Sequence, residues 1–450
     1  MAEIKQPKKF NHLTAVSSLD GRFRGRIEDL HTYFSEYATI GGRVFVEIEY
    51  LIAILQKIKK PLTKTAIAKL RKIAIDFSET DAETIWKIDE KINHDTKAVE
   101  IFLSKKLEKL GLKQVVNYLH FGLTSTDIDN TAYALSLKNF LVEVAIPKIK
   151  EVINSLKQIE KKQKSQPMLA RTHGKIAVPT TVGQEISKYR NRLEVQLANL
   201  QTYKMGSKMT GAIGNHNALF AAYPNVDWFA FTSRFLKSLG IESYESTTQV
   251  EPYDHKVEFF QIFKRINTII QVLDEDIWRY LALGLLSLRD AKGHVGSSTM
   301  PQKINPIGFE MSENYVLLAN AIFELAERKL PTNRWQRDLT DKYLLRDVSQ
   351  AFVMSVLAYE STSEALTQIG FNKGMLDREL DEHWEAIAEG IQTILRTTDL
   401  TEPYEKLKEL TRGKVVTQET YDKFTNELDV PENLKAKLRE LSPSTYIGKQ

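Results

Sequence analysis

The 450-residue sequence contains no cysteine, which excludes disulfide bonds, thiolate metal sites and thiol catalysis. Its longest uncharged apolar stretch, Tyr280–Leu288, is far shorter than the roughly 20 residues that a membrane-spanning helix needs. Residues 1–10 contain lysines, but no apolar segment follows them, so we expect no signal peptide. These absences predict a cytoplasmic protein that does not associate with membranes.

Motifs for metal, nucleotide-cofactor and nucleic-acid binding are also missing. None of the nine histidines falls in the HExxH spacing of a zinc helix, and no glycine-rich phosphate loop or dinucleotide fingerprint occurs. The 62 basic and 58 acidic residues are interspersed and leave a formal net charge of only +4, without the basic stripe of a nucleic-acid binder. We therefore expect no metal, no cofactor and no nucleic-acid partner. An anionic small-molecule substrate would need only a local cluster of arginines and lysines.

Apolar residues recur at helical spacing through most of the chain. Residues 1–115 predict an N-terminal helical domain, in which one helix stops before Pro61. Residues 370–450 predict a small C-terminal helical domain, with helices near 375–396, 403–412, 417–427 and 431–441. Between them, residues 116–369 form the central domain, with long apolar stripes at 137–159, 182–200, 255–288, 306–329 and 340–369.

The central stripes indicate helices longer than a small domain needs. A helix of over thirty residues is about 50 Å long, and rods of this kind usually form bundles that pack across subunits. Pro147 is expected to kink the first rod rather than end it. The sequence therefore predicts an all-α, three-domain protein with a central bundle of long helices.

The segment Gly296–Pro306 reads GSSTMPQKINP and is predicted to be a loop, because two prolines forbid an uninterrupted helix. One interpretation is a mobile catalytic segment, in which Ser297 and Ser298 act as a base and an anion ligand while Lys303 and Asn305 hold a carboxylate. The other is a polar connector, in which Asn305 caps a helix and Pro306 is its first residue. Composition alone slightly favours the connector.

Four further groups of polar residues are candidates for a site. Thr124 and Asp127 have the spacing of a capping box before a long helix, and the free amides there, with Ser125, would also suit a carboxylate. A lone histidine is more often structural than catalytic, but His173 lies in RTHGK on a connection between two long helices. Its place in a loop, flanked by Arg171 and Gly174, makes it a better acid–base candidate than most. The pair His94-Asp95 suits equally the orientation or polarisation of a bound group and a place on the surface. The cationic run Arg334, Arg337, Lys342 and Arg346 is typical of a solvated face, and its position at a helix junction also suits phosphate or carboxylate binding.

Residues 297–306 match every fixed position of SSxMPxKxNP, the signature of the fumarase/aspartase superfamily. Within that superfamily the chain resembles the adenylosuccinate lyase family, almost from end to end. The blocks that carry this closer resemblance are LTAVSSLDGRF, NHDTKAVE, HFGLTSTDIDN, RTHGKIAVPTT, GAIGNHNALFAAYPNVDW, TTQVEPYDH, RWQRDLTD and PYEKLKELTRGK.

The resemblance implies elimination of fumarate from adenylosuccinate, giving AMP, and from succinyl-aminoimidazole carboxamide ribotide, giving AICAR, in purine biosynthesis. It implies that Ser297 is the general base and His173 the general acid, with Ser297 activated by loop closure, nearby amides and Lys303. It further implies a homotetramer of the three-domain fumarase/aspartase-like fold, whose active sites are each built from three subunits.

The same resemblance assigns the residues that bind the substrate. The succinyl carboxylates would be held by Thr124, Ser125, Ser298, Lys303 and Asn305. The nucleotide phosphate side would be held by Arg22, Arg337 and Arg346. The remaining pocket positions would be Phe23, Asn93, His94, Asp95, Gln249, Met311, Lys342 and Tyr343.

Several positions depart from the family's usual pattern. Gln302 stands where a histidine is usual, Phe23 where a tyrosine is usual, Met311 where an asparagine is usual, and Lys342-Tyr343 where a serine-threonine pair is usual. Gln302 is more typical of argininosuccinate lyases, which leaves a sister lyase as one alternative. A catalytically silent helical oligomer is another, and it is disfavoured by the presence of Ser297, His173, Lys303 and Asn305.

Overall fold

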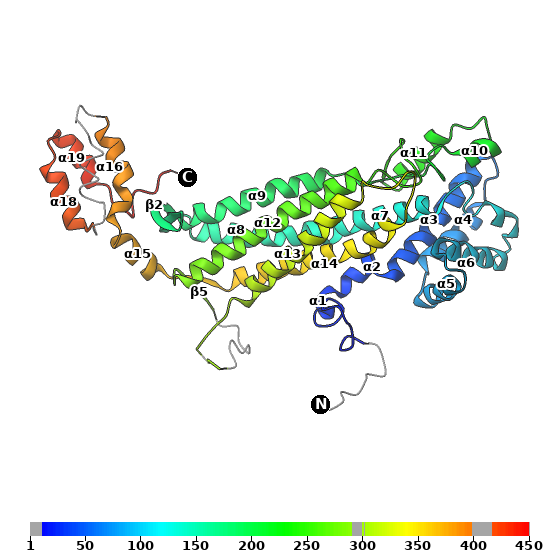
Figure 1. Cartoon of the computed structure of the whole chain (residues 1–450), viewed down its shortest axis with the longest axis horizontal. Coiled ribbons are helices and arrows are strands. Elements are labelled where there is room, and N and C mark those ends of the chain that lie inside the picture. Colours follow the sequence, from blue (N-terminus) through cyan, green and yellow to red (C-terminus); the bar gives the residue numbers. More distant parts are fainter. Residues whose placement is uncertain (1–10, 290–298, 301, 398–415, 450) are drawn as a thin grey trace. The chain divides into compact units, whose positions relative to one another are not determined.

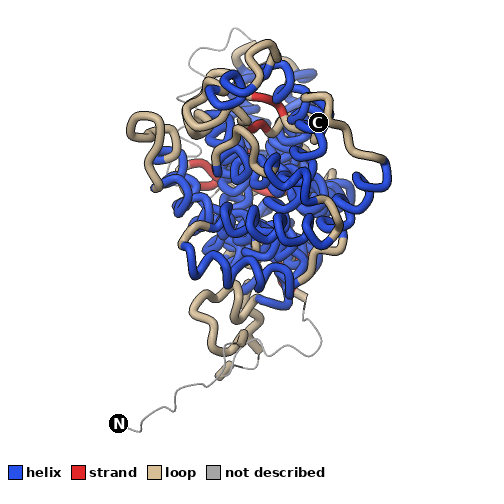
Figure 2. The backbone as a smooth tube through the Cα atoms, turned by 90° about the vertical axis from the view of Figure 1, so that its right-hand side faces the viewer, coloured by secondary structure: helices blue, strands red, loops and turns tan. Residues whose placement is uncertain are grey.

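A computed structural model describes residues 11–289, 299–300, 302–397 and 416–449. In this part of the chain the secondary structure is mainly helical, with three short two-stranded sheets (Figures 1 and 2). None of the described helices is long and apolar enough to cross a membrane.

The N-terminal segment contains one long helix, α3 (Glu36–Lys57), and several shorter ones, and three of its helices begin at polar caps. Ser35, Thr63 and Ser78 each accept a hydrogen bond from the first turn of the helix that follows, as N-cap residues do. The helix expected before Pro61 is confirmed as α3, which ends at Lys57. The elements are α1 (Arg24–Ile27), η1 (Glu28–Leu30), α2 (His31–Phe34), α3 (Glu36–Lys57), α4 (Lys64–Ile75), α5 (Glu79–Ile92), α6 (Asp95–Lys109) and η2 (Lys113–Tyr118).

The long helices follow the predicted apolar stripes. The first rod stays helical past Pro147 through one π-helical turn, η3 (Leu141–Ala145), which accommodates a residue that lacks an N–H and crowds the preceding turn. The long elements are α7 (Ser125–Phe140), α8 (Ile146–Lys162), α9 (Val182–Thr202), α12 (Asp254–Ala282), α13 (Ile307–Lys329) and α14 (Thr340–Thr367), with the short helices α10 (Asn217–Ala222) and α11 (Trp228–Ser238) between α9 and α12.

Three strand pairs interrupt the helical pattern. The predicted helix 255–288 ends early, at Ala282, because Gly284 adopts a left-handed conformation (φ 72°) and residues 286–288 become a strand. The pairs are the antiparallel β1 (Pro167–Thr172) and β2 (Lys175–Thr181), the parallel β3 (Gly206–Ser207) and β4 (Glu242–Ser243), and the antiparallel β5 (Leu286–Leu288) and β6 (Ile369–Phe371).

The C-terminal segment has its own small core. Trp384, Ile391, Leu395, Tyr421 and Leu438 are buried together there. Its described elements are α15 (Lys373–Asp381), η4 (Trp384–Ile387), α16 (Ala388–Leu395), α18 (Gln418–Glu427) and α19 (Glu432–Arg439). The helix predicted near 403–412 lies outside the described residues.

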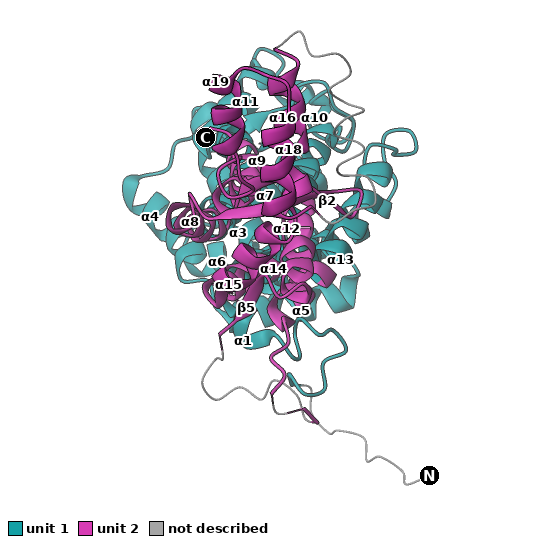
Figure 3. Cartoon of the chain, turned by 90° about the vertical axis from the view of Figure 1, so that its left-hand side faces the viewer, with its two compact units in different colours: residues 1–148, 196–267, 315–357 teal, residues 149–195, 268–314, 358–450 magenta. Residues whose placement is uncertain are grey.

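The contacts within the chain group it into two compact units (Figure 3). Unit 1 comprises residues 1–148, 196–267 and 315–357, and unit 2 comprises 149–195, 268–314 and 358–450. In unit 1, the rings of Phe140, Phe263, Phe323 and Phe352 lie 5.0–6.3 Å apart and form an aromatic core. The three-domain division stays a prediction.

Candidate active site

The N-terminus of α7 is built as the sequence predicts. Thr124 is the N-cap in an extended conformation, and the Asp127 carboxylate accepts a hydrogen bond of 2.8 Å from its backbone N–H. The predicted capping box is therefore confirmed. Ser125 is the first helical residue, and both hydroxyl side chains are half-buried. Unpaired amides at such a terminus favour a carboxylate or phosphate.

A buried ion pair fixes this terminus. The Asp127 carboxylate also accepts from the backbone N–H groups of Thr210 (3.1 Å) and Gly211 (3.2 Å) and from the Lys208 ammonium (2.9 Å). Both charged side chains have no exposed surface. Burial lowers the pKa of Lys208, and Asp127 offsets part of that effect. The segment after α9 is thereby held against the start of α7.

A chain of main-chain contacts brings Gln249 and Arg337 close to α7. The Thr126 hydroxyl donates to the carbonyl of Gln249, whose own N–H donates to the carbonyl of Gln336 at 3.3 Å. Arg337 follows Gln336 in the chain, and its Nη1 lies 3.4 Å from Asp341 Oδ2. The same oxygen also accepts a hydrogen bond from the Tyr253 hydroxyl at 2.7 Å. Two of the predicted substrate-binding residues therefore lie near the α7 terminus.

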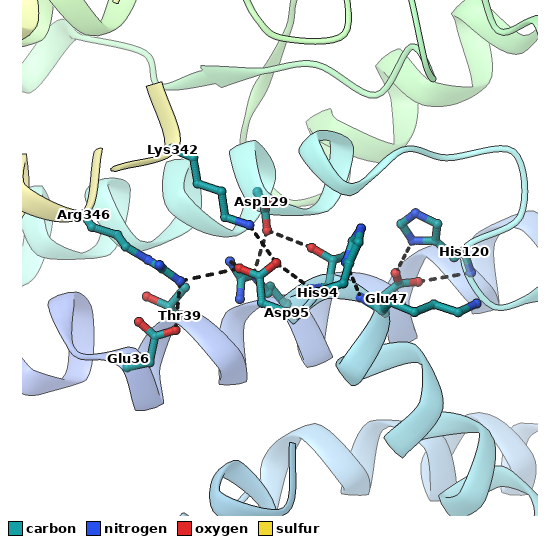
Figure 4. A network of polar contacts seen from close by, with 12 residues as sticks. Glu36, Thr39, Glu47, His94, Asp95, His120, Asp129, Lys342 and Arg346 are labelled. Carbon is teal, nitrogen blue, oxygen red and sulfur yellow. Dashed lines mark hydrogen bonds and ion pairs between the residues drawn. The ribbon is translucent and has the colours of Figure 1, made fainter. Parts of the chain in front are cut away.

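Asp95 lies at the centre of a second polar network (Figure 4). It begins α6 and is only 8% exposed. Oδ1 is 2.7 Å from Lys342 Nζ, while Oδ2 is 2.9 Å from Arg43 Nη2 and 3.5 Å from Arg346 Nη2. Burial by itself would raise the pKa of Asp95, but the charges of Arg43 and Lys342 outweigh it and hold that pKa well below its usual range. The carboxylate is therefore ionised and holds three cations.

His94 and Asn93 precede this network on the chain. His94 is exposed and is the N-cap of α6, where its Nδ1 accepts from the Lys97 N–H at 3.2 Å. In the neutral ring the proton therefore sits on Nε2, which leaves that nitrogen as a donor. Asn93 is exposed in a left-handed conformation (φ 53°), which asparagine tolerates better than most residues.

A cleft of about 180 Å³ in unit 1 has residues of both networks in its wall. Three of the predicted residues line it, namely Arg337, Lys342 and Arg346. The sequence did not single out its other polar wall residues, which are Tyr33, Glu36, Thr39, Arg43, Thr126, Asp129, Asn130, Tyr133, Ser136, Tyr253, Asp341 and Ser349.

Four predicted residues are not part of the wall of this cleft. Arg22 is exposed in the turn before α1, and Phe23 packs edge-on against Tyr315 with the ring centroids 5.5 Å apart. Tyr343 is 63% exposed although its neighbour Lys342 joins the network. Met311 is half-buried in α13, in unit 2.

Part of the signature segment is described. Lys303 is exposed and Asn305 half-buried, just before α13. The helix begins at Ile307, so the expectation that Asn305 is the cap and Pro306 the first helical residue is wrong by one position. The carbonyl of Pro306 itself accepts from the N–H groups of Phe309 (3.0 Å) and Glu310 (3.2 Å), as a cap residue does. Ser297 and Ser298 lie outside the described residues.

His173 occupies the turn of the β1–β2 hairpin in unit 2. His173 and Gly174 both have positive φ angles, 55° and 71°, as a two-residue hairpin turn requires. Its side chain is exposed. The expected connection between long helices is thus a hairpin, which the sequence did not predict. Arg171, at the base of the turn, pairs with Glu379 of α15.

His120 is a polar residue for which the sequence predicted no role of its own. Its Nδ1 is 2.5 Å from Glu47 Oε1, and its backbone N–H donates to Glu47 Oε2 at 3.2 Å (Figure 4). Burial lowers the pKa of His120, but the fully buried Glu47 outweighs it, so the net shift is upward. His120 lies four residues before Thr124, inside the block HFGLTSTDIDN. Its place in that block is the sequence feature that could have identified it.

Among the described residues, no three histidine, aspartate or glutamate side chains converge as metal ligands. The arrangement in unit 1 is instead that of an anion site. Four cations, Arg43, Arg337, Lys342 and Arg346, line the cleft together with Thr126 from the first turn of α7. Such a site can orient a molecule that carries carboxylate and phosphate groups.

Comparison with known proteins gives matches along nearly the whole chain. The family described as "Lyase" matches residues 13–319, and the one described as "Adenylosuccinate lyase C-terminal" matches residues 333–447. The chain is 43% identical to the adenylosuccinate lyase of Haemophilus influenzae over 97% of both chains. It is 42% identical to that of Escherichia coli K12 over 98% of both, and 42% identical to that of Dictyostelium discoideum over 98% of this chain and 97% of the relative.

Solved structures share the fold. The fumarate lyase of Mesorhizobium sp. BNC1 superposes with a TM-score of 0.76 at 18% identity, covering 94% of this chain and 95% of that one. The β-carboxy-cis,cis-muconate cycloisomerase of Acinetobacter calcoaceticus gives a TM-score of 0.73 at 16% identity with the same coverage. The predicted helical, fumarase/aspartase-like fold is confirmed.

Proposed function

The chain belongs to the adenylosuccinate lyase family, and we propose that it releases fumarate from adenylosuccinate by β-elimination, with His173 as general acid and Ser297 as general base. The observation that carries this proposal is the similarity to adenylosuccinate lyases along almost the entire chain. The same chemistry applies to succinyl-aminoimidazole carboxamide ribotide, which carries the same succinyl-amine group and gives AICAR.

The two proposed acid–base residues divide the proton transfers. Ser297 takes the proton from the carbon next to a succinyl carboxylate, and the electron pair left behind forms the new double bond as the carbon–nitrogen bond breaks. His173 gives a proton to the departing nitrogen, so fumarate and AMP leave as the products. The exposed position of His173 on a tight turn supports this role, because the imidazole is accessible to a ligand.

The remaining predicted residues bind the substrate. Thr124 and Ser125 at the α7 terminus, with Ser298, Lys303 and Asn305, bind the succinyl carboxylates, and negative charge that builds up on them in the transition state is stabilised there. Arg22, Arg337 and Arg346 bind the phosphate. The pocket is completed by Phe23, Asn93, His94, Asp95, Gln249, Met311, Lys342 and Tyr343. The positions of Arg337, Lys342 and Arg346 in one cleft support this assignment.

We further propose a cytoplasmic homotetramer whose active sites are shared between subunits. Support comes from α13, where Leu317, Leu318 and Leu325 are 45–50% exposed in the single chain. Exposed leucines spaced along a long helix are typical of a surface that another helix covers. Size-exclusion chromatography with light scattering measures the assembly, and a monomer would be incompatible with shared sites.

The activity is tested by incubating the purified protein with adenylosuccinate, argininosuccinate, malate and aspartate and following fumarate release. We expect fumarate from adenylosuccinate and none from the other three. Argininosuccinate is the critical control because Gln302 is the residue that resembles the sister enzyme. Release from argininosuccinate alone would replace the proposal with that activity, and no release from any substrate would favour a structural oligomer.

A further inference from the structure

Arg43 is a buried arginine on the apolar side of α3, and no sequence motif predicts a role for it. It is 3% exposed and lies beside the fully buried Val44. Its Nε donates to Asp129 Oδ1 at 2.7 Å, and its Nη2 donates to Asp95 Oδ2 at 2.9 Å. The guanidinium thus links α3 to a carboxylate of α7 and to a carboxylate of α6.

Burying an arginine in this way is costly unless both charge and hydrogen bonds are satisfied. Burial alone would lower the pKa of Arg43, and the two carboxylates outweigh that effect. The third nitrogen, Nη1, has no hydrogen-bond partner among the described residues. The bonds to Asp95 and Asp129 are therefore what fixes the side chain at the wall of the cleft.

We propose that Arg43 is a positioning residue of the active site. By fixing the Asp95 carboxylate, it sets where Lys342 stands in the pocket and where Arg346 stands to receive the substrate's phosphate. The inference rests on the proposed function, since it takes the cleft to be the place where the nucleotide binds. Arg43 acts through Asp95 and is not itself assigned a contact with the reacting atoms.

The geometry of Asp95 carries the argument. Arg43 occupies Oδ2, and Lys342 occupies the opposite oxygen, Oδ1, which also accepts from the N–H of Thr96 at 2.9 Å. Arg346 stands farther off, 3.5 Å from Oδ2, and its other carboxylate neighbour is Glu36 at 3.3 Å. Because Arg43 holds Oδ2, Arg346 keeps only a loose contact there and remains available to an anion.

The charges of the cleft point to the same role. Arg43, Lys342 and Arg346 are balanced by Asp95, Asp129 and Glu36. Removing the charge of Arg43 leaves the cluster with an excess of one negative charge, and Asp95 would then draw Arg346 and Lys342 towards itself. Both effects oppose the binding of a phosphate dianion while leaving the proton-transfer residues unchanged.

Lysine cannot replace the arginine in this arrangement. The planar guanidinium donates from two different nitrogens to two carboxylates, whereas an ammonium is a single point of charge on a shorter reach. We therefore expect Arg43→Lys to restore the charge balance but not the placement of Asp95.

The test compares Arg43→Met, Arg43→Lys and the control Arg71→Met. Like Arg43, Arg71 pairs with a carboxylate on another helix, in this case Glu49 of α3 at 2.7 Å. The Arg71 side chain is 52% exposed and does not line the cleft. The measurements are kcat and KM for adenylosuccinate and the inhibition constants of AMP and of adenosine, which lacks the phosphate. Thermal unfolding of each variant reports whether the protein is folded.

For Arg43→Met we expect KM and the AMP inhibition constant to rise together by roughly 10- to 100-fold, as for misplacement of binding groups. We expect kcat and the adenosine constant to stay within about threefold. Arg43→Lys should show a smaller rise in the same two constants, and Arg71→Met should match the wild type. Added guanidinium ion should partly restore the KM of Arg43→Met.

An unchanged KM, or equal losses for AMP and adenosine, would overturn the proposal. The proposal would also be overturned if Arg43→Lys bound adenylosuccinate and AMP as the wild type does, because a positive charge at this position would then be sufficient. If Arg43→Met does not fold, Asp129→Asn removes one of the two anchors while keeping the arginine, and it should raise KM by a smaller factor. The wild-type assay for fumarate tests the proposed function separately, since that result does not depend on the variants.

Discussion

The buried Asp127–Lys208 pair allows a quantitative prediction, made with the substitution Lys208→Met. The lysine Nζ contacts Asp127 Oδ1 and the carbonyl of Gly211, both at 2.9 Å, and neither charged side chain is exposed. Methionine fills a similar volume but leaves the aspartate charge buried without a partner. Breaking a buried pair in this way costs about 3–5 kcal/mol, which corresponds to roughly 10²- to 10⁴-fold in an equilibrium constant.

The effect is expected first as local opening around Thr210 and Gly211, because their backbone N–H groups donate directly to Asp127. Amide hydrogen exchange in the native protein measures the free energy of that opening. Protection of these two amides should fall by roughly 10²- to 10⁴-fold in Lys208→Met, by the magnitude above.

The control is Lys188→Met, which removes a lysine that pairs at the surface with Glu185 at 2.5 Å and is 44% exposed. Surface pairs of this kind contribute only about 0–1 kcal/mol. The double variant Asp127→Asn/Lys208→Met removes both charges and should recover part of the lost protection. If Lys208→Met lost no more amide protection than Lys188→Met, the Asp127–Lys208 pair would not be what holds the segment around Thr210 and Gly211.

Three further predictions concern chemistry, pH and a steric clash. Ser297→Ala and His173→Ala should each lower kcat by roughly 10²- to 10⁴-fold with the oligomer intact. Burial raises the pKa of the Asp274 carboxyl well above its ordinary value. The protonated carboxyl therefore contributes its full share of stability below a pH of about 3.9, and that contribution is lost as the pH rises towards the pKa in the folded state. Asp274→Asn should accordingly unfold at a higher temperature than the wild type near neutral pH. Gly122→Ala should destabilise the protein by more than Gly111→Ala, because both glycines have positive φ but only at Gly122 would a Cβ clash, 2.3 Å from a leucine side chain.

Each of these has a result that would contradict it. Full turnover in either alanine variant removes that residue from the acid–base pair. Asp274→Asn fails as a prediction if its melting temperature falls below that of the wild type at neutral pH, or if the difference does not shrink as the pH is lowered. Equal unfolding free energies for the two glycine variants would show that the clash at Gly122 is relieved by movement of the leucine.

Local features of the site were predictable from the chain itself. The Thr124–Asp127 capping box depends on residues three apart, and α3 ends before Pro61 for a reason that is visible in the sequence. The one-residue error at Pro306 and the missed hairpin around His173 arose at the ends of helices. Proline and glycine there indicate a break in the helix without deciding what replaces it.

The roles of the buried charged residues could not be predicted from the sequence. Arg43, Glu47 and Lys208 carry no motif, and each occurs among apolar or ordinary polar neighbours. Their importance comes from partners distant in the chain, since Arg43 and Asp95 are 52 positions apart and Lys342 and Asp95 are 247 apart. A pattern of spacing cannot identify such pairs, because burial is what makes a charge need its partner.

The sequence by itself determined the helical class, the ends of several helices and, through its motifs, the family and the residues expected to transfer protons. These features depend on local backbone preferences and on short runs of residues. The order of residues in such a run does not change when the chain folds. The tertiary structure alone decided that one carboxylate, Asp95, holds Arg43, Lys342 and Arg346 together at the wall of one cleft. That arrangement requires three helices to exclude water around the same charge, and only folding brings them there.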